Sequence, residues 1–565
     1  MVYCSIRGSR ISFNYFWDIL YPRYPRRQRD RQPGGHRQQR TARGGTLSAC
    51  LKFRGIMKLT LERYRSKLLG CWLGKNIGGT LGAPFECKRG TFDVTFYTQD
   101  LGGEPLPNDD LDLQLVWLNA VEKYGRALNA KLLGEYWLTH VTPHWAEYGA
   151  GKNNLRAGLE PPLSGYVHNL NRDSCGAFIR SELWACLAPG RPDLAVRYAY
   201  EDAIVDHSRE GVYGEIFCAA VESAAFAESD PGTLYKIGLS YIPADCGIAH
   251  GIASVLDSFR AGADWREARK RLLTVVPDSF GLLGTPYETV TEDIPIGAVG
   301  YDAPANVGLM ILGWVYGKGD FGASLCTAVN CGEDTDCTAG TLGSILGIIG
   351  GIESIPARWA EPLGRSIKTL CIDLADYGYN VPKTVDELTE RVLRQAPIWL
   401  GPKNCDVLAP KGYTIDMLEG EALYAHPQRW GAFIRRGFDE ILVHQPFTVE
   451  HDYHLFNTLL DYGSEPYIQE CVPCTLRLTI DNHLSRQQWL RLAWHLPEGW
   501  EISPEPVLAL PLEQYGATTG RSVVEFTLTP HGLNQDRYNL VLEIGSLGHV
   551  ELPLIPVVLL TGSPL

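Results

Sequence analysis

The sequence predicts a multidomain chain in which an all-α domain over residues 57–400 precedes an all-β sandwich over residues 445–565. Its 565 residues are too many for one hydrophobic core. Apolar residues of the first part recur at helical spacing. In "DDLDLQLVWLNAVEKYG" one helix face carries Leu111, Leu115, Leu118 and Val121. The last part instead has alternating, β-branched runs such as "CTLRLTI" and "SVVEFTLT", which are typical of strands in an antiparallel sandwich. Residues 401–444 are predicted to be a connector.

A basic segment precedes the predicted helical domain. Residues 1–56 contain eleven Arg, one Lys and two Asp, a net charge of +10 within a chain whose total is −13. The stretch "PRYPRRQRDRQPGGHRQQRTARGG" has nothing that could form a core, so we expect disorder here. Two interpretations stay open, a basic or targeting arm and upstream sequence translated ahead of a natural start at Met57. The acidic remainder disfavours nucleic acid as a partner.

The cysteines and the apolar runs indicate in which cellular compartment the protein is expected. No apolar run reaches about 18 residues, so we expect neither a transmembrane helix nor a membrane partner. The fifteen cysteines follow no paired framework, and several lie in apolar stretches where a free thiol behaves as a small buried hydrophobe. This distribution favours a cytoplasmic protein with reduced thiols. The single "CVPC" (Cys471 to Cys474) is more typical of strand residues than of half a zinc site.

The first predicted helix contains a glycine at every fourth position. In "LLGCWLGKNIGGTLGAPFE" these residues form one face: Gly70, Gly74, Gly78 and Gly82. Each glycine in a helix interior costs about 1 kcal/mol relative to alanine. Four of them therefore predict close packing against another helix or the close approach of a ligand. Pro84 ends the helix, and Glu86 follows it as a carboxylate that, taken alone, would be typical of a solvated loop.

Two later helices begin with acidic clusters. Asn108, Asp109 and Asp110 begin one in "PNDDLDLQL", and Asp334 and Asp336 begin the other in "CGEDTDCTAG". Each cluster alone is compatible with helix capping and with the helix dipole. The same oxygens are the ligands that Mg²⁺ and Mn²⁺ prefer. If the two helix starts converge, four aspartates would repel one another unless divalent cations neutralise them.

Other common catalytic motifs are missing from the sequence. There is no GxSxG, no GxxxxGK[ST], no HExxH and no strand followed by GxGxxG. Serine hydrolase, nucleoside triphosphate and nicotinamide chemistry are therefore disfavoured. In "EDAIVDHSREGVYGEIF", His207 precedes a Gly-x-x-Gly turn into a helix, and a single histidine in such a place is more often structural.

Four of these segments together, over roughly residues 60–375, resemble the ADP-ribosylglycohydrolase family, which includes the dinitrogenase reductase-activating glycohydrolases. "GCWLGKNIGGTLGAPFE" is similar to the family's opening G-x-x-x-G-D-x-x-G-x-P-x-E segment, and "GEDTDCTAGTLGSILG" to its closing G-x-D-T-D-T-x-A helix. "NDDLDLQLVWL" is similar to its T-D-D-x-Q helix start, and "AIVDHSREGVYGEIFCAA" to its Thr/Ser-His segment. The resemblance implies an orthogonal bundle of α-helices around two divalent cations, Mg²⁺ or Mn²⁺.

The resemblance also implies the residues of a site. The implied metal ligands are Asn108, Asp109, Asp110, Asp334, Asp336 and Cys337. The implied catalytic residues are Glu86, Asp110 and Asp334, with Glu86 as the general base or as the group that orients a metal-bound water. Candidate substrate contacts are His207, Gly211 and Tyr213.

Four positions depart from the family pattern. Asn108 and Cys337 each stand where threonine is usual, and Lys75-Asn76 replaces a frequent Gly-Asp pair. An amide carbonyl can still bind Mg²⁺, whereas a thiol is a poor ligand for a hard cation. These departures bear on the ADP-ribose specificity more than on the metal site.

The predicted function is that of a Mg²⁺- or Mn²⁺-dependent glycohydrolase, which cleaves the anomeric ribosyl bond of an ADP-ribosylated protein or small molecule. Two alternatives stay open, a hydrolase of another furanoside or nucleoside-like glycoside, and a non-catalytic binding or structural protein on the same scaffold. The C-terminal part, through "LPEGW" and its strand rhythm, resembles immunoglobulin-like modules attached to bacterial glycoside hydrolases. A structural lid or a dimerisation domain is the alternative for it.

Overall fold

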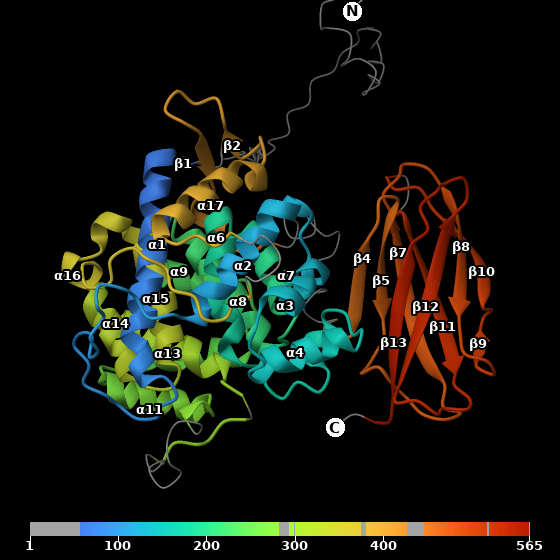
Figure 1. Cartoon of the computed structure of the whole chain (residues 1–565), viewed down its shortest axis with the longest axis horizontal. Coiled ribbons are helices and arrows are strands. Elements are labelled where there is room, and N and C mark those ends of the chain that lie inside the picture. Colours follow the sequence, from blue (N-terminus) through green and yellow to red (C-terminus); the bar gives the residue numbers. More distant parts are fainter. Residues whose placement is uncertain are drawn as a thin grey trace, which may run out of the picture. The chain divides into compact units, whose positions relative to one another are not determined.

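The computed structural model describes residues 57–281, 293–298, 300–373, 380–426, 446–516 and 519–563. The predicted basic extension, residues 1–56, lies outside these ranges. The first part of the described chain is helical, as the sequence predicts, and Figure 1 shows the helices gathered around α1, α15 and α8. Within the described ranges no helix combines the length and the apolar character that crossing a membrane requires.

The α-helices vary widely in length. Their bounds are α1 Leu61–Gly82, α2 Asp109–Tyr124, α3 Ala130–His140, α4 Ala146–Arg156, α5 Leu163–Tyr166, α6 Glu182–Leu187, α7 Pro192–Ala203, α8 Glu210–Ala224, α9 Pro231–Leu239, α10 Gly247–Arg260, α11 Trp265–Val275, α13 Ala303–Gly317, α14 Phe321–Asn330, α15 Thr335–Gly350, α16 Ala357–Ala360 and α17 Val385–Leu400. Short 3₁₀ turns lie between some of them, including η1 (Ala83–Phe85) and η3 (Cys175–Arg180). The helices share one continuous core with fully buried indoles at Trp72, Trp117, Trp137, Trp184 and Trp314.

Helices α1 and α15 pack against each other along the glycine face that the sequence predicts. A Cβ on Gly70 would overlap the backbone of Gly347, and a Cβ on Gly78 would overlap that of Ala339. The order of these pairs makes the helices antiparallel. Of the two explanations for the glycine stripe, close helix packing is therefore the one that the structure supports. Because α15 runs against α1, the start of α15 lies beside the end of α1, where Thr335 Oγ1 donates a hydrogen bond to the Gly82 carbonyl (2.9 Å).

A small antiparallel sheet joins the beginning of the described chain to the region after α17. Its strand order is β1 (Met57–Thr60), β3 (Thr414–Met417), β2 (Cys405–Asp406). In the register of the first pair, Met57 faces Met417 and Thr60 faces Thr414. The predicted connector over 401–444 thus contributes two strands, and its residues 427–444 lie outside the described ranges.

The C-terminal part consists of strands in two five-stranded sheets. Their bounds are β4 Thr448–Asp452, β5 Phe456–Asp461, β6 Tyr467–Ile468, β7 Cys474–Asn482, β8 Gln488–His495, β9 Glu501–Ser503, β10 Val507–Leu512, β11 Arg521–Thr529, β12 Arg537–Ser546 and β13 Leu554–Thr561. One sheet has the order β10-β8-β12-β13-β6 and the other β4-β5-β7-β11-β9. Among the described residues, every pairing between these strands is antiparallel except that of β13 with β6.

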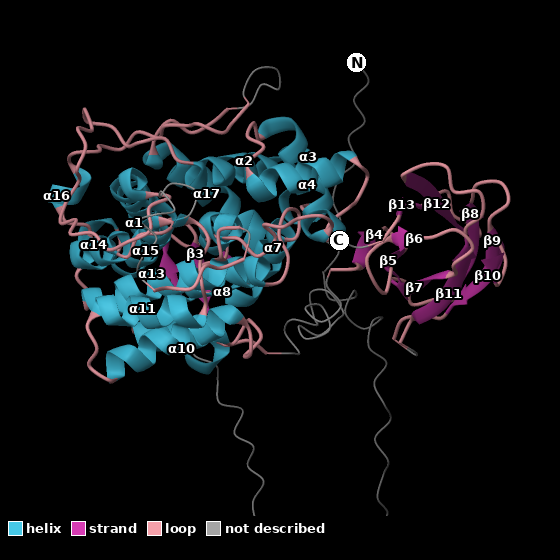
Figure 2. Ribbon diagram, turned by 90° about the horizontal axis from the view of Figure 1, so that it is seen from below, coloured by secondary structure: helices cyan, strands magenta, loops and turns pink. Residues whose placement is uncertain are grey.

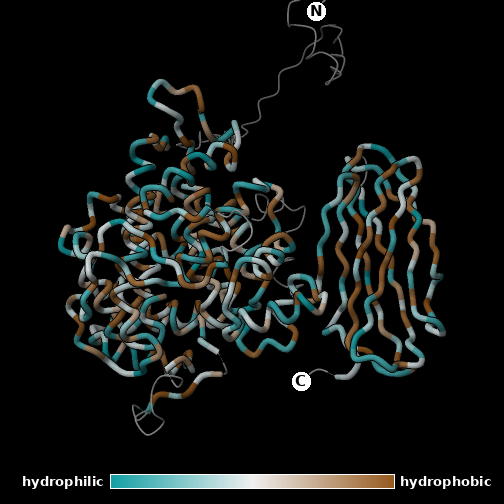
Figure 3. The backbone as a smooth tube through the Cα atoms, viewed as in Figure 1, coloured by the Kyte–Doolittle hydropathy of each residue, from teal (hydrophilic) through white to brown (hydrophobic). Residues whose placement is uncertain are grey.

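The two sheets share one core, and Figure 2 shows them facing each other. Leu476, Leu478 and Ile480 of β7 alternate with exposed or half-buried neighbours, a period of two that the hydropathy colours of Figure 3 follow along the strands. This agrees with the predicted two-sheet β region. The strand pairings do not show an immunoglobulin-like topology.

Candidate metal centre and active site

The predicted acidic segments converge at one cavity of about 230 Å³. The α1–α15 packing brings the start of α15 to the end of α1. The start of α2 is held at the same place, because Asn108 packs against Gly79 and its Nδ2 donates to Asp336 Oδ2 (3.3 Å). The cavity is lined by Glu86, Cys87, Asp109, Trp145, Ala146, Glu147, Tyr148, Cys175, Gly176, Ile179, Phe280, Tyr301, Asp334, Asp336 and Cys337. Asp110 lies buried beside Cys337.

At the start of α2, one residue caps the helix and the next lines the cavity. Asn108 is the N-cap residue, and its Oδ1 accepts a hydrogen bond from the backbone N–H of Asp110 (2.8 Å). Asp109 Oδ2 accepts from the Tyr148 hydroxyl (2.9 Å) and faces the cavity. The capping interpretation is therefore confirmed for Asn108. The side chains of Asp109 and Asp110 instead contact Tyr148 and Cys337.

At the start of α15, capping does not account for the carboxylates. Asp334 occupies the N-cap position, yet its side chain makes no capping hydrogen bond. Its Oδ2 lies 2.6 Å from the Cys175 thiol. Asp334 Oδ1 and Asp336 Oδ1 are both buried and accept no hydrogen bond from the described residues. Buried carboxylate oxygens without a donor are costly. Their chemistry fits a bound cation.

Two buried arginines hold the turn that leads into α15. Glu333 has a positive φ of 67° and a fully buried side chain. Its Oε1 lies 2.9 Å from Arg89 Nε and 3.3 Å from Arg269 Nη2, and Arg269 Nε also donates to the Cys331 carbonyl. These bonds fix the strained residue directly before Asp334. The motif comparison did not single out Glu333 or its arginine partners.

Burial raises the pKa values of three aspartates of the site, Asp109, Asp110 and Asp336, when no cation is bound. Burial raises the pKa of Asp110 to about 7, although the nearby Lys75 lowers it. Burial, together with the charges of Glu86 and Asp334, raises the pKa of Asp336 well above its usual value. Burial also raises the pKa of Asp109. Since a bound cation favours the ionised carboxylate, cations and protons would compete for this site.

Glu86 lies in the rim of the cavity and is exposed, in contrast to the aspartates. Partial loss of hydration at its carboxyl group, followed by the charges of Asp334, Asp109 and Asp110, raises the pKa of Glu86 to about 8. A carboxyl group with a pKa close to neutral pH can both accept and donate a proton.

Lys75, one of the departures from the family pattern, supplies a buried positive charge behind the cavity. Its ammonium group lies 3.2 Å from Asp110 Oδ2 and 2.8 Å from Glu182 Oε1. It also donates to the Ile179 carbonyl (2.7 Å). These contacts raise the pKa of Lys75 despite its burial. The lysine therefore neutralises part of the negative charge that Asp110 brings to the site.

Two thiols lie among the oxygen ligands. Cys175, Asp334 and Cys337 form one group whose ligand atoms all lie within 4.8 Å of one another, and Asp110, Asp336 and Cys337 form another. Cys337 is thus common to both groups, with its sulfur 3.5 Å from Asp110 Oδ1. The residues fit divalent cations, with a donor set of mixed oxygen and sulfur.

The candidate substrate residues lie outside the cavity lining. His207 is fully buried, with Nδ1 2.9 Å from Asp206 Oδ1 and Nε2 2.9 Å from Ser174 Oγ. Gly211 packs against the His207 ring, and Tyr213 is half-buried on the first turn of α8. His207 approaches the cavity through Glu147, whose Oε1 lies 3.8 Å from Nε2. A substrate role for these three residues remains a prediction.

The sequence motifs do not mark several residues of the cavity wall. Glu147, Tyr148, Cys175, Phe280 and Tyr301 come from separate segments, and only folding brings them together. No motif marks them, and Cys175 in particular is indistinguishable in sequence from the other scattered cysteines. Burial raises the pKa of Glu147 to about 7, so a second group with a pKa near neutral lies in the wall.

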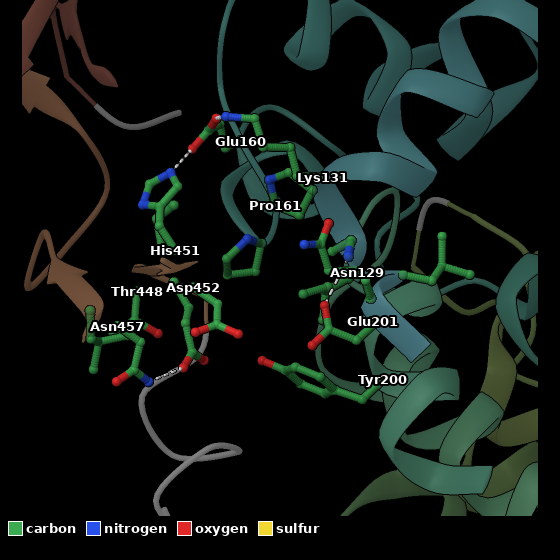
Figure 4. A pocket seen from close by; sticks show the side chains of 18 of the residues that line it. Asn129, Lys131, Glu160, Pro161, Tyr200, Glu201, Thr448, His451, Asp452 and Asn457 are labelled. Atoms are coloured by element: carbon green, nitrogen blue, oxygen red, sulfur yellow. Dashed lines mark hydrogen bonds and ion pairs between the residues drawn. The ribbon is translucent and has the colours of Figure 1, made fainter. Parts of the chain in front are cut away.

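A larger cavity of about 450 Å³ contains none of the predicted site residues. Figure 4 shows its polar lining, with Lys131 and Glu201 on one side and His451 and Asp452 on the other. Glu160 accepts a hydrogen bond from Lys131 Nζ and lies 2.5 Å from His451 Nε2. None of the described residues that line this cavity has a buried carboxylate oxygen without a partner, in contrast to the acidic site. The acidic site is therefore the stronger candidate for chemistry.

Comparison with known proteins agrees with the sequence motifs. The ADP-ribosylglycohydrolase family profile matches residues 60–393, more than half of the chain. A solved structure described as an "ADP-ribosylglycohydrolase-related protein complex" is similar at 19% sequence identity and a TM-score of 0.39, over 60% of this chain and 100% of that one. None of the curated proteins matches the chain.

Proposed function

Because the chain belongs to the ADP-ribosylglycohydrolase family, we propose that it is a divalent-cation-dependent glycohydrolase. Its substrate is an ADP-ribosylated protein or small molecule, and the bond cleaved is the one at the anomeric carbon of the ribose. The observation that carries the proposal is the convergence of Glu86 with the acidic starts of α2 and α15 at one cavity.

The carboxylates of the site would hold the cations. Asp110, Asp334 and Asp336 are buried, and two of them have oxygens that accept no hydrogen bond from the described residues. Asp109 and Cys337 complete the set at the cavity wall. A divalent cation bound there would lower the pKa of a coordinated water and provide a nucleophile near neutral pH.

In this proposal the protein residues bind the sugar and move the proton. Glu86 accepts the proton of the attacking water, a role supported by its exposed position in the cavity rim and its raised pKa. Tyr148 holds Asp109 through its hydroxyl, which keeps that carboxylate directed at the cavity. Trp145, which stacks on Tyr148, and Tyr301, which packs on Phe280, offer apolar surfaces for a sugar ring.

The size of the cavity bears on the substrate. Pockets for whole ligands usually measure about 300–1,000 Å³, and this one has about 230 Å³. It therefore suits a single pentose, with the remainder of the substrate outside. The same observation keeps a second candidate function open, hydrolysis of another furanoside or nucleoside-like glycoside. A non-catalytic role on the same scaffold is the third.

The test combines metal content with hydrolysis. Purified full-length chain is loaded with divalent cations, its metal content is measured, and the release of ADP-ribose from an ADP-ribosylated protein is followed beside the hydrolysis of simple pentofuranosides. We expect bound cations and ADP-ribose release in the wild type. In Asp334→Asn and Asp336→Asn we expect both to fall sharply. Hydrolysis of pentofuranosides alone would favour the second candidate. A protein that binds no metal and hydrolyses none of these substrates would overturn the enzyme proposal.

Three further expectations belong with this proposal. An immunoglobulin-like fold for the C-terminal sheets, as in modules of sugar-cleaving enzymes, remains a prediction, as do the domain boundaries at residues 57, 400 and 445. A cytoplasmic location is likewise a prediction, which imaging of the tagged full-length protein would test.

A further inference from the structure

We propose that the cation site is built for a thiophilic divalent metal, zinc foremost, bound by the Cys337 thiolate together with aspartate oxygens. This inference rests on the proposed function only in using the same site. It differs from the Mg²⁺ or Mn²⁺ that the family resemblance implies. The observation behind it is the position of two thiols inside the acidic cluster.

Two groups of donor atoms are each compact enough to bind a metal ion. The ligand atoms of Asp110, Asp336 and Cys337 lie within 4.8 Å of one another, and so do those of Cys175, Asp334 and Cys337. Cys337 belongs to both groups, so its sulfur would be a ligand in either one. Cys175 is in direct contact with Asp334 (Sγ to Oδ2, 2.6 Å).

A second observation distinguishes this cluster from an ordinary set of buried cysteines and acids. Asp334 and Asp336 are 1% and 4% exposed, and each has one carboxylate oxygen that accepts no hydrogen bond from the described residues. Both aspartates and both thiols line the same cavity. Unpartnered oxygens and thiols that face a common space form a ligand set, whereas the isolated Cys326 packs as a small apolar group.

The chemistry of the donors selects the class of metal. Thiolate sulfur is a soft ligand that favours zinc over magnesium, and zinc also accepts carboxylate oxygen. Binding proceeds with loss of the thiol proton to solvent, and the sulfur then donates an electron pair to the cation. No oxidant or reductant takes part.

Cobalt substitution provides a readout that does not depend on catalysis. Metal-free full-length protein, kept reduced, is titrated with Co²⁺, and its near-ultraviolet and visible absorption is recorded. We expect an intense thiolate-to-cobalt charge-transfer band in the wild type, which Zn²⁺ abolishes by displacement and excess Mg²⁺ leaves in place. Cys337→Ser should lose the band, and Cys175→Ser should weaken it.

Cys326→Ser is the matched control, because that thiol is also buried, at 8% exposed against 7% for Cys337, and belongs to neither group. It should retain the full band. The thermal unfolding of each metal-free variant shows whether it is folded. If Cys337→Ser does not fold, the weakened band of Cys175→Ser and the Zn²⁺ displacement in the wild type decide the proposal.

The two proposals fail in different ways. A cobalt complex of the wild type without a thiolate band, or a band that survives in folded Cys337→Ser, overturns the thiophilic site. Hydrolysis supported by Mg²⁺ would then leave the proposed function intact. A thiolate band that depends on Cys337, in a protein that hydrolyses no glycoside with any cation, supports the metal site and overturns the glycohydrolase.

Discussion

At the scale of single residues, the site contains carboxylates in two kinds of environment. Asp110, Asp334 and Asp336 are buried, so their carboxylates have lost the water around them and a bound cation can take its place. Glu86 remains exposed at the rim. This contrast favours cation binding by the aspartates and proton transfer by the glutamate, because a group that exchanges protons needs access to water or substrate.

Replacement of Glu86 separates these roles. We expect Glu86→Gln to lower kcat about 10²- to 10⁴-fold, the usual effect of removing a general base. Because the side chain is exposed, the unfolding temperature and the metal content should stay at wild-type values. Steady-state kinetics and metal analysis measure both.

Glu135→Gln is the control for this prediction, since Glu135 is an exposed glutamate on α3 outside the cavity lining. It should have wild-type kinetics. Full turnover by Glu86→Gln would remove Glu86 from the proposed mechanism.

At the scale of secondary-structure elements, the antiparallel contact of α1 with α15 positions the site. Glycines on both helices allow their backbones to touch, from Gly70 with Gly347 to Gly82 with Thr335. This contact places the α15 carboxylates at the end of α1, close to Glu86. The small residues thus position the metal site although none of them is a ligand.

A methyl group in this contact should be destabilising. A Cβ on Gly74 would overlap the carbonyl of Gly343, and backbone atoms cannot move away as a flexible side chain can. We expect Gly74→Ala to lower the free energy of unfolding by about 1–3 kcal/mol, the usual cost of overpacking. Chemical denaturation of the full chain measures it.

Gly232→Ala in the first turn of α9 is the matched control, because Gly232 is exposed and a Cβ there would meet only one side-chain oxygen of Asp230, at 3.4 Å. Its stability should lie within about 1 kcal/mol of the wild type. An unchanged stability of Gly74→Ala would contradict the close helix contact.

At the scale of the whole molecule, a few polar contacts connect residues of the helical part with residues of the sheets. Glu160, which precedes α5, is in contact with Lys131 of α3 and His451 of β4. Burial alone would raise the pKa of Glu160, but the bonds from His451 and Lys131 lower it below its usual value. The ionised carboxylate is therefore favoured in the folded protein.

This contact should make stability depend on pH in the acid range. A lowered folded pKa contributes stability above the unfolded value of about 4.3 and loses it as the pH falls through the folded value. We expect Glu160→Gln to be about 1.5–3 kcal/mol less stable than the wild type at pH 6–7, as for hydrogen bonds to charged groups. The difference should shrink below about pH 4.

Chemical denaturation of the wild type and Glu160→Gln between pH 3 and 7 (about the range in which a glutamate titrates) measures the two free energies of unfolding. A difference that does not change with pH would mean that the charge of Glu160 contributes nothing to folding.

The sequence alone determined the order of the two structural classes, the glycine face of α1 and the two acidic helix starts. Each depends on a local pattern, hydrophobic periodicity or residue spacing, that needs no knowledge of the fold. The family, too, was recognisable from these motifs, since all four occur along the chain in the order that is typical of the family.

Only the tertiary structure decided what those patterns do. It showed that the glycines contact a helix, that Asn108 caps while Asp334 does not, and that Lys75 neutralises Asp110. It also brought Cys175 to Cys337 and Asp334. Residues more than 150 positions apart meet in this site through the packing of α1, α15 and η3. The contacts of that packing are long-range, and no local spacing in the sequence records them.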